Sequence, residues 1–358
     1  MIYALDASYS LGRDPSGVAV YCSRIIQALA EAAPDDRFVL CYRANRFFRA
    51  LLSPLPASNC SRRLMEEFAP FLPPRQAALF HGLNQRLPRT LFPRGGCRAI
   101  TTFHDLFVMS GDYSTPEFRA RFSGLARDAA GRSDHIIAVS QFTAGQIAEY
   151  LNYPCDRINV VHHGVDPVPE FSPQSRDAFR RKLELEAPFL LHVGAIQQRK
   201  NVARLVQAFE GLPERYLLVL AGAAGHGARE ILDRIERSPA RRRIRVLGYR
   251  NRDELNHLYR TATALAFASL EEGFGIPVLE AMSAGLPVVT SNSSALKDVA
   301  GDAALLVDPL DVDALRGALQ AALEDKGARE RLIAAGFRRA AEFTWQRAAR
   351  ETLAVYRS

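Results

Sequence analysis

The pattern of apolar and polar positions alternates between strand-like and helix-like segments, most clearly in the C-terminal half of the chain. There, short continuous apolar runs end at a glycine or a polar turn, and segments with helical periodicity follow. Apolar strands that alternate with helices are typical of a parallel sheet covered on both faces. The expected strands cover residues 189–193, 216–220, 244–247, 265–269, 287–290 and 304–307. The expected helices cover residues 202–210, 228–236 and 253–259, and another begins near Pro277.

The N-terminal half repeats this alternation less regularly. Its expected strands cover residues 2–6, 38–42, 78–81, 99–103 and 135–140, and a long helix pattern covers residues 18–30. Because 358 residues exceed what one hydrophobic core usually supports, we predict two Rossmann-like domains. Two prolines and several polar residues interrupt the periodicity near residues 168–173. We therefore place the domains at residues 1–168 and 169–340, with a C-terminal helix in residues 341–358 that crosses back to the first domain.

The composition is that of an ordinary globular chain with a diffuse basic bias. Hydrophobic residues make up 48% of the chain and charged residues 24%, and the net charge is +7. Residues 1–165 hold 18 Arg and 14 Asp or Glu, which leaves +4 there and +3 in the remainder. This spread excludes a basic nucleic-acid tail. It suits an acidic ligand such as a nucleotide diphosphate, or an anionic membrane surface.

Cysteine usage and hydropathy bear on location. The five cysteines show neither paired nor metal-type spacing, which indicates free thiols in a reducing compartment. The chain enters a strand at residue 2, and no apolar run approaches the ~18 residues of a membrane span. We expect a cytoplasmic protein. The basic aromatic stretch Arg43–Leu52 fits two interpretations equally well: an amphipathic segment on the inner face of the membrane, or a solvated helix packed on its domain.

The most informative segment follows the expected strand at residues 265–269. Gly273 and Gly275 allow the backbone to approach a ligand closely. Glu272 lies in this turn and Glu280 on the following helix, so both carboxylates can face the crevice at the carboxyl end of a strand, where open α/β sheets bind ligands. Amides at the helix start would favour an anion such as a diphosphate. Two solvated surface acids would leave the glycines unexplained.

This segment resembles the signature of family 4 retaining glycosyltransferases. Seven residues separate Glu272 from Glu280, Gly-Phe-Gly lies between them, and Ala-Gly-Leu-Pro-Val follows. The resemblance extends over nearly the whole chain. It implies the GT-B fold, in which two Rossmann-like domains face each other across a cleft, the C-terminal one binding a nucleotide-sugar donor and the N-terminal one the acceptor. We expect no metal, because no Asp-x-Asp stands at a strand end, and no resident cofactor.

The resemblance also implies roles for individual residues. Glu280 would hydrogen-bond the donor ribose, and Glu272 would lie beside the transferred sugar as a catalytic residue. The sugar hydroxyls would contact the backbone of Gly273, Phe274, Gly275 and Ile276. Tyr249, after the strand at residues 244–247, is our candidate for contact with the base.

A basic pair follows the strand at residues 189–193. Arg199 and Lys200 lie where a strand-end loop meets a helix, and their charges can neutralise a diphosphate leaving group. A solvated basic turn is the alternative. Members of the family use a basic pair here on the donor phosphates, which favours a donor-binding and catalytic role. Some members add an arginine directly after the glycine, where this chain has Ala195.

Two motifs in the N-terminal half also follow strands. Gly17 ends a loop that lacks the full glycine pattern of dinucleotide-binding folds. By resemblance its N–H would contact phosphate, although a plain helix start would also suit glycine. His104 and Asp105 follow the strand at residues 99–103. The resemblance places His104 near the transferred sugar and the acceptor, with Asp105 orienting it or making a second contact.

Other histidines receive structural interpretations. His162 and His163 are adjacent on an extended segment and point to opposite faces, which favours a hinge over a metal site. His192 lies in a strand pattern and is expected in the core.

The function we predict is the transfer of a sugar to a glycan or lipid-linked acceptor. The first guess is mannose from GDP-mannose, as in bacterial surface-polysaccharide mannosyltransferases. Two alternatives stay open: a nucleotide-sugar epimerase on the same fold, and a non-catalytic nucleotide-sugar-binding scaffold. A dehydrogenase would need the missing glycine fingerprint, and no motif supports nucleic-acid binding.

Overall fold

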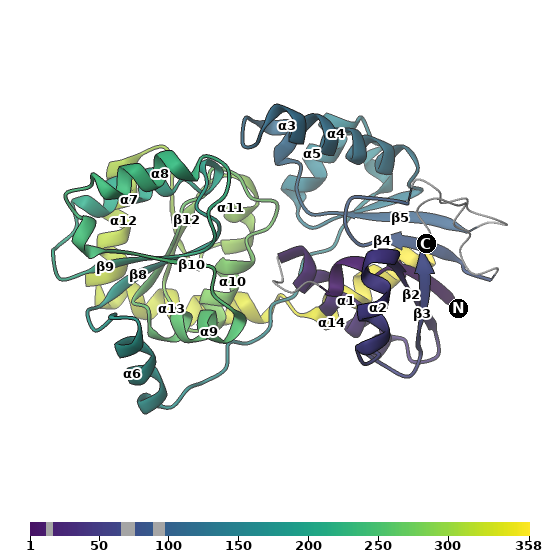
Figure 1. Ribbon diagram of the computed structural model, residues 1–358, viewed down its shortest axis with the longest axis horizontal. Coiled ribbons are helices and arrows are strands. Elements are labelled where there is room, and N and C mark those ends of the chain that lie inside the picture. Colours follow the sequence, from purple (N-terminus) through teal and green to yellow (C-terminus); the bar gives the residue numbers. More distant parts are fainter. Residues whose placement is uncertain (12–16, 66–75, 89–96) are drawn as a thin grey trace. The chain divides into compact units, whose positions relative to one another are not determined.

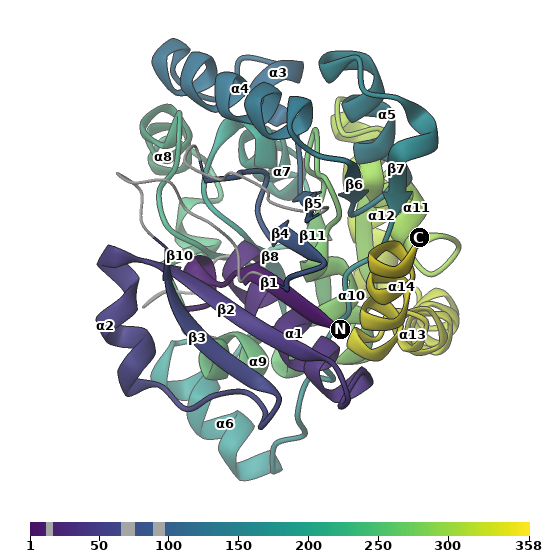
Figure 2. The same cartoon turned by 90° about the vertical axis from the view of Figure 1, so that its right-hand side faces the viewer.

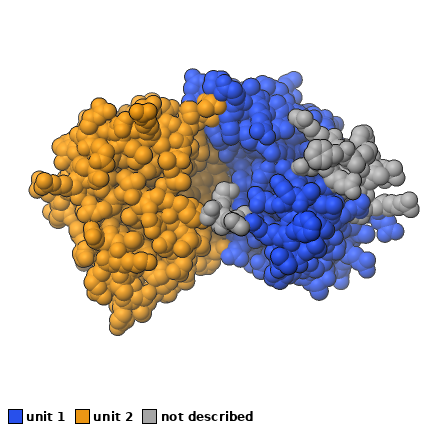
Figure 3. Space-filling view, in the orientation of Figure 1, with its two compact units in different colours: residues 1–112, 116–164, 343–358 blue, residues 113–115, 165–342 orange. Residues whose placement is uncertain are grey.

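The computed structural model describes residues 1–11, 17–65, 76–88 and 97–358 (Figure 1). The chain divides into two compact units, which Figure 3 colours separately. Unit 1 comprises residues 1–112, 116–164 and 343–358, and unit 2 comprises residues 113–115 and 165–342. The sequence-based prediction placed the divisions after residues 168 and 340.

Unit 2 is built on a parallel sheet with the strand order β10-β9-β8-β11-β12-β13. Its strands are β8 (Phe189–Val193), β9 (Leu217–Ala221), β10 (Ile244–Gly248), β11 (Ala264–Phe267), β12 (Val288–Ser291) and β13 (Leu305–Val307). The chain leaves β8 toward β9 on one side and leaves β11 toward β12 on the other. The carboxyl ends of β8 and β11 therefore form a topological switch point, which is where open α/β sheets bind ligands.

Helices connect these strands and cover the sheet. They are α6 (Pro173–Lys182), α7 (Val202–Glu210), α8 (Ala228–Glu236), α9 (Arg252–Thr261), α10 (Ile276–Ser283), α11 (Ser294–Ala300), α12 (Val312–Glu324) and α13 (Lys326–Ala341), with the 3₁₀ turns η3 (Gln198–Lys200) and η4 (Arg241–Arg243). Every residue of β8 and β11 is buried, as their uninterrupted apolar sequences predict. His192 on β8 is fully buried, so its predicted place in the core is confirmed.

Unit 1 holds a second parallel sheet, which among the described residues has the strand order β3-β2-β1-β4-β5-β6-β7. The strands are β1 (Ile2–Asp6), β2 (Arg37–Arg43), β3 (Cys60–Met65), β4 (Leu79–Gly82), β5 (Arg98–Phe103), β6 (His135–Ala138) and β7 (Ile158–Val160). The helices are η1 (Ser8–Leu11), α1 (Gly17–Ala32), α2 (Ala44–Leu52), α3 (Phe107–Ser110), α4 (Pro116–Gly131), α5 (Gln141–Leu151), η2 (Cys155–Arg157) and α14 (Trp345–Arg357). Figure 2 shows α2 beside β3, the edge strand at one end of this sheet.

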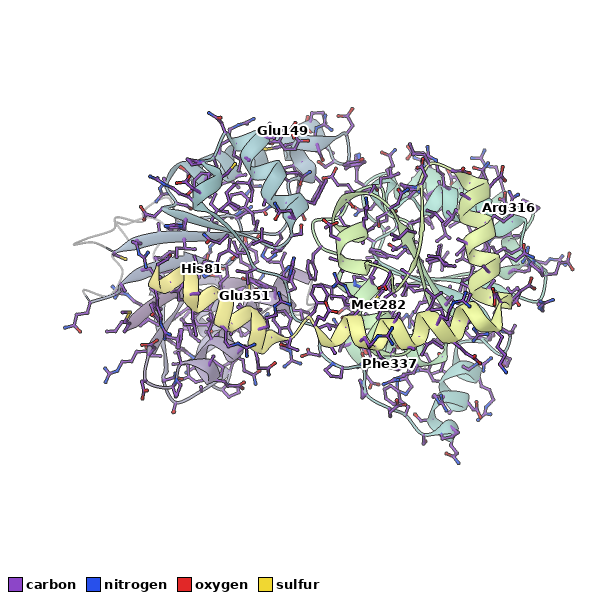
Figure 4. All side chains as sticks on the ribbon, turned by 180° about the vertical axis from the view of Figure 1, so that it is seen from behind. His81, Glu149, Met282, Arg316, Phe337 and Glu351 are labelled. Atoms are coloured by element: carbon purple, nitrogen blue, oxygen red, sulfur yellow. The ribbon has the colours of Figure 1, made fainter. Side chains whose placement is uncertain are left out.

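The last helix of the chain, α14, packs against α1 in unit 1. The hydroxyl of Tyr356 lies 2.6 Å from Nδ1 of His81, and its ring centroid lies 4.9 Å from that of Tyr3. Figure 4 shows His81 beside this helix. Nε2 of His81 lies 2.8 Å from the hydroxyl of Thr102. Residues from the two ends of the chain thus share one core.

Two strands differ from the sequence-based expectation. Neither β3 nor β7 was predicted. Arg62 and Arg63 interrupt the apolar pattern of β3, which an edge strand tolerates because one of its sides is not covered by another strand. β7 spans three residues, and the polar Asn159 interrupts its apolar run, whereas the equally short β13 is wholly apolar. No helix within the described residues is long and apolar enough to cross a membrane.

Candidate functional site

The loops that follow β8 and β11 meet at the switch point of unit 2. The first loop carries Arg199 and Lys200 on η3, and the second carries Glu272. The amide of Leu270 donates to the carbonyl oxygen of Arg199 over 2.8 Å, so the backbone itself joins the two loops. The structure therefore brings the predicted basic pair and the first glutamate of the signature together.

The loop after β8 is held in place by the loop after β9. The amides of Gly194 and Ile196 donate to the carbonyl oxygens of Ala221 and Ala223, each over 2.9 Å. A Cβ atom at Gly222 would lie 1.9 Å from the carbonyl oxygen of Gly194. Only glycine permits so close an approach of two backbones. The position of the basic pair thus depends on a glycine outside the predicted motifs.

Asn201 anchors the end of η3 to the sheet. Its backbone is left-handed, with φ of 57°, a conformation that asparagine adopts more readily than most residues. The side-chain Nδ2 of Asn201 donates to the carbonyl oxygens of Ala268 (3.0 Å) and Pro309 (2.6 Å). Asn201 was not among the predicted site residues. Its place between the basic pair and a helix was the available signal, because polar residues favour helix starts.

Arg199, Lys200 and Glu272 form a buried ion cluster. Nη1 of Arg199 donates to Oε2 of Glu272 over 3.0 Å and also to the carbonyl oxygen of Glu271. Nζ of Lys200 donates to Oε1 of Glu272. Burial opposes ionisation of Glu272, but Arg199 and Lys200 outweigh it and lower the pKa of its carboxyl group from 4.5 to about 2. Glu272 is therefore ionised at neutral pH.

The balance of charge in this cluster defines what it can bind. Among these three residues, the two positive charges of Arg199 and Lys200 exceed the single negative charge of Glu272. Nζ of Lys200 also lies 4.8 Å from the ring centroid of Phe267, which adds a cation–π contact. Fixed and partly desolvated cations bind phosphate oxygens strongly. The cluster has the chemistry of an anion site.

The turn after Glu272 prepares the start of α10. Gly275 caps this helix with φ of 107°, a value that strains any residue with a side chain. Pro277 follows in the first turn, where its missing N–H is not needed. Phe274 is buried. Gly273, Phe274, Gly275 and Ile276 therefore present a fixed backbone beside the ion cluster, and their contacts with a sugar stay a prediction.

Glu280 is buried on α10 and lies in a second network, formed with α9. The hydroxyl of Tyr259 donates to Oε2 of Glu280 over 2.7 Å, and Nη1 of Arg252 donates to Oε1. Burial, the Glu280 charge and their hydrogen bond raise the pKa of Tyr259 well above 10.0. Neither partner was among the predicted site residues, although both belong to one amphipathic helix. Tyr249 lies just beyond β10 and is 47% exposed, and its contact with a base stays a prediction.

The remaining predicted residues belong to unit 1. His104 is buried, its Nε2 lies 2.9 Å from the carbonyl oxygen of Leu83, and its Nδ1 lies 3.5 Å from Nε2 of His163. Burial lowers the pKa of His104 from 6.5 to about 4, against the opposing effect of the Leu83 carbonyl. His104 is thus neutral at pH 7. Its contact with sugar or acceptor stays a prediction.

The two other residues selected in this unit lie at its loops. Asp105 is partly exposed and directly follows His104. Gly17 is exposed at the start of α1, and residues 12–16 of its loop lie outside the described residues. Across the described chain, no group of three or more His, Cys, Asp or Glu side chains is arranged to hold a metal ion.

Comparisons with known proteins match both halves of the chain. Residues 15–168 match the family model described as Glycosyltransferase Family 4, and residues 174–339 match that described as Glycosyl transferases group 1. The chain is 34% identical over 286 residues to O-antigen chain mannosyltransferase B of Escherichia coli, which covers 78% of this chain and 74% of that protein. It is 31% identical over 260 residues to the serotype-specific mannosyltransferase WbdA of Escherichia coli, covering 69% of this chain but only 32% of that longer relative.

Solved structures show the same fold at low sequence identity. Sucrose-phosphate synthase from Thermosynechococcus elongatus has a TM-score of 0.77 at 20% identity, covering 100% of this chain and 98% of that one. HepE of Anabaena, in complex with UDP and glucose, has a TM-score of 0.75 at 17% identity, covering 99% of both chains. The predicted class of two Rossmann-like domains is confirmed. Because O-antigen chain mannosyltransferase B matches about three quarters of both chains at 34% identity, the protein belongs to glycosyltransferase family 4, a GT-B enzyme that transfers a hexose from a nucleotide sugar.

Proposed function

We propose that the protein is a retaining mannosyltransferase that uses GDP-mannose and needs no metal. The observation that carries this proposal is the buried cluster of Arg199, Lys200 and Glu272 at the switch point of unit 2. Two fixed cations there can neutralise the diphosphate as the sugar leaves, which is the electrostatic contribution that usually dominates such transfers. The similarity to O-antigen chain mannosyltransferase B supports mannose.

The donor would lie along the ends of β8 and β11. Its phosphates would contact Arg199 and Lys200, and its ribose would contact Glu280. The backbone of residues 273–276 would hold the sugar hydroxyls beside Glu272, and Tyr249 would contact the base. The amide of Gly17 would add a phosphate contact from unit 1. His104 and Asp105 would bind the sugar or a glycan or lipid-linked acceptor.

Retention would proceed by attack on the face of the sugar that the diphosphate leaves. The acceptor oxygen forms the new bond to the anomeric carbon as the bond to the phosphate oxygen breaks, and a phosphate oxygen accepts the acceptor's proton. A covalent route would need a carboxylate on the opposite face of the anomeric carbon. Glu272 is ill suited to that task, because both of its oxygens are engaged by Arg199 and Lys200.

We also propose that unit 1 contacts the inner face of the cytoplasmic membrane through α2. Phe48 and Leu52 on this helix are 80% and 89% exposed. Residues 37–65 contain six Arg and no Asp or Glu. Exposed apolar side chains within a uniformly basic segment suit a surface of anionic lipids. Such contact would bring the enzyme to a lipid-linked acceptor.

The donor assignment is tested by thermal unfolding with GDP, UDP, ADP and dTDP and their common sugar conjugates, without metal. A ligand that binds the folded state raises the melting temperature. We expect GDP and GDP-mannose to stabilise the protein most, and Glu280→Ala to abolish the shift. Stabilisation by UDP alone would refute the donor base, and no stabilisation at millimolar ligand would refute the site. A new sugar nucleotide formed from donor alone would instead identify an epimerase.

A further inference from the structure

The loop that follows β12 lies against the loop that carries Glu272. Beyond the end of β11, side-chain hydroxyls from β12 and its loop take over from the backbone ladder of the sheet. The hydroxyl of Ser291 donates to the carbonyl oxygen of Ser269 over 2.5 Å. Further along, Oγ of Ser294 accepts from the amide of Glu272 over 3.2 Å. The two loops are therefore joined up to the glutamate of the ion cluster.

The main chain of Glu272 is held at both of its polar groups. Its amide donates to Ser294, and its carbonyl oxygen accepts from the amide of Ala295 over 3.3 Å. Its carboxylate, by contrast, is bound by Arg199 and Lys200. A donor diphosphate would compete with that carboxylate for the same two cations. When it does, the contacts with residues 294 and 295 remain to hold the turn in place.

Ser294 reaches the amide of Glu272 from a left-handed backbone, with φ of 54°. Glycine and asparagine adopt this conformation readily, whereas a serine adopts it at a cost in free energy. Asn201, which anchors the start of the same loop through Ala268, is also left-handed. Such residues cluster at functional sites, where the surrounding structure determines them. Because glycine would adopt the same backbone without strain, the serine indicates a use for its hydroxyl.

We propose that Ser294 is a positioning residue for the transfer step, which keeps the Glu272 turn in one conformation while the donor diphosphate engages the two cations. The inference rests on the proposed function, because it takes Glu272 to lie beside the transferred sugar. Ser294 acts through the main chain of Glu272 and needs no contact with the donor. Its loss should therefore slow the transfer and leave the affinity for the nucleoside diphosphate unchanged.

The test uses two substitutions that remove the hydroxyl and differ in backbone preference. Ser294→Gly suits the left-handed conformation, whereas Ser294→Ala retains its strain, so the glycine variant should have the higher melting temperature. When no acceptor is supplied, water takes its place, and the release of GDP and mannose from GDP-mannose reports the transfer step. Titration calorimetry gives the affinity for GDP. Hydrogen–deuterium exchange of residues 270–275 reports the contact with Glu272 directly.

Both variants should behave alike, although their stabilities differ. Because a neutral hydrogen bond is lost, we expect each to release GDP about fivefold more slowly and to bind GDP within about twofold of the intact protein. Exchange in residues 270–275 should become faster. Ser293→Ala is the matched control, because Ser293 has φ of −121° and its Oγ lies 3.5 Å from the carbonyl oxygen of Leu270. It should leave GDP release unchanged.

The outcomes separate this inference from the proposed function. Release of GDP by Ser294→Gly at the rate of the intact protein, or unchanged exchange in residues 270–275, would refute the positioning role. GDP release and GDP affinity that both follow the melting temperature would show a merely structural serine and refute it as well. If the intact protein releases a nucleoside diphosphate from neither GDP-mannose nor UDP-glucose, the proposed function fails instead. The exchange measurement then still decides whether Ser294 holds the turn.

Discussion

Replacing Glu272 with glutamine should destabilise the free enzyme and raise its affinity for a nucleoside diphosphate. In the structure the carboxylate neutralises one of the two cations that we assign to the donor phosphates. Glu272→Gln removes that charge with little change in shape. The diphosphate would then meet the same two cations with one negative charge fewer beside them. Turnover should nevertheless fall, since we propose that Glu272 lies beside the transferred sugar.

The size of the effect follows from the pKa of Glu272. Its pKa falls from 4.5 to about 2 in the folded protein, a difference of about 2.5, which corresponds to ~3 kcal/mol of stabilisation of the ionised form. Because the folded-state pKa is lowered, this stabilisation is present above pH 4.5 and is lost as the pH falls toward 2. We expect the free energy of unfolding of Glu272→Gln to be ~3 kcal/mol lower than that of the parent at pH 7. We expect its affinity for GDP to be about tenfold higher or more.

Chemical denaturation and calorimetry with GDP measure the two quantities separately. Glu324→Gln serves as a control, because Glu324 pairs with Arg215 at the exposed surface and its loss should cost less than about 1 kcal/mol. The stability gap between the enzyme and Glu272→Gln should close as the pH falls below 4.5. A variant as stable as the parent, or one that binds GDP more weakly, would refute the account of a carboxylate that competes with phosphate.

Three further predictions concern other parts of the molecule. Gly222→Ala should abolish GDP binding while unit 1 stays folded, because the new methyl group displaces the loop that carries the basic pair; calorimetry and circular dichroism test this. Burial lowers the pKa of His81 from 6.5 to about 3, so the contribution of His81 to stability is complete above pH 6.5 and should fall by ~2 kcal/mol by pH 5. In denaturation experiments His81→Gln should remove that share of the pH dependence and leave the shares of His104 and His192, whose pKa values burial also lowers. Phe48→Ser with Leu52→Ser should reduce flotation with anionic vesicles, whereas Leu310→Ser, at another exposed apolar position, should not. If the double variant and Leu310→Ser lost flotation to the same extent, docking through α2 would be refuted.

Much of the fold was predictable because its strands are buried on both faces. The prediction for β8 agrees at both ends, and that for β11 differs by one or two residues. Such strands carry an uninterrupted apolar signal. The edge strand β3 was missed because its pattern includes Arg62 and Arg63. The local apolar pattern indicates whether a strand is buried. It does not indicate whether the strand lies at an edge, because that depends on the order of strands in the whole sheet.

The candidate site was predictable in its residue types and less so in its contacts. Arg199, Lys200 and Glu272 were selected separately, and the structure brings them together because β8 and β11 are neighbours. Their mutual ion pairs do not follow from either motif alone. Arg252 and Tyr259 were overlooked because their helix shows ordinary amphipathic spacing, and only the burial of Glu280 distinguishes them. Contacts between residues that lie far apart in sequence cannot be predicted from the local pattern around either residue.

The return of α14 to unit 1 has a consequence for synthesis. The ribosome delivers residues 1–164 early, yet the core around Tyr3 and His81 lacks Tyr356 until residues 343–358 have emerged. Unit 2 is contiguous apart from residues 113–115 and can close in the meantime, since domains generally fold as units during translation. Nascent unit 1 therefore keeps apolar surface uncovered until the final segment of the chain has been synthesised. A chain that stops short would expose that surface to chaperones and proteases.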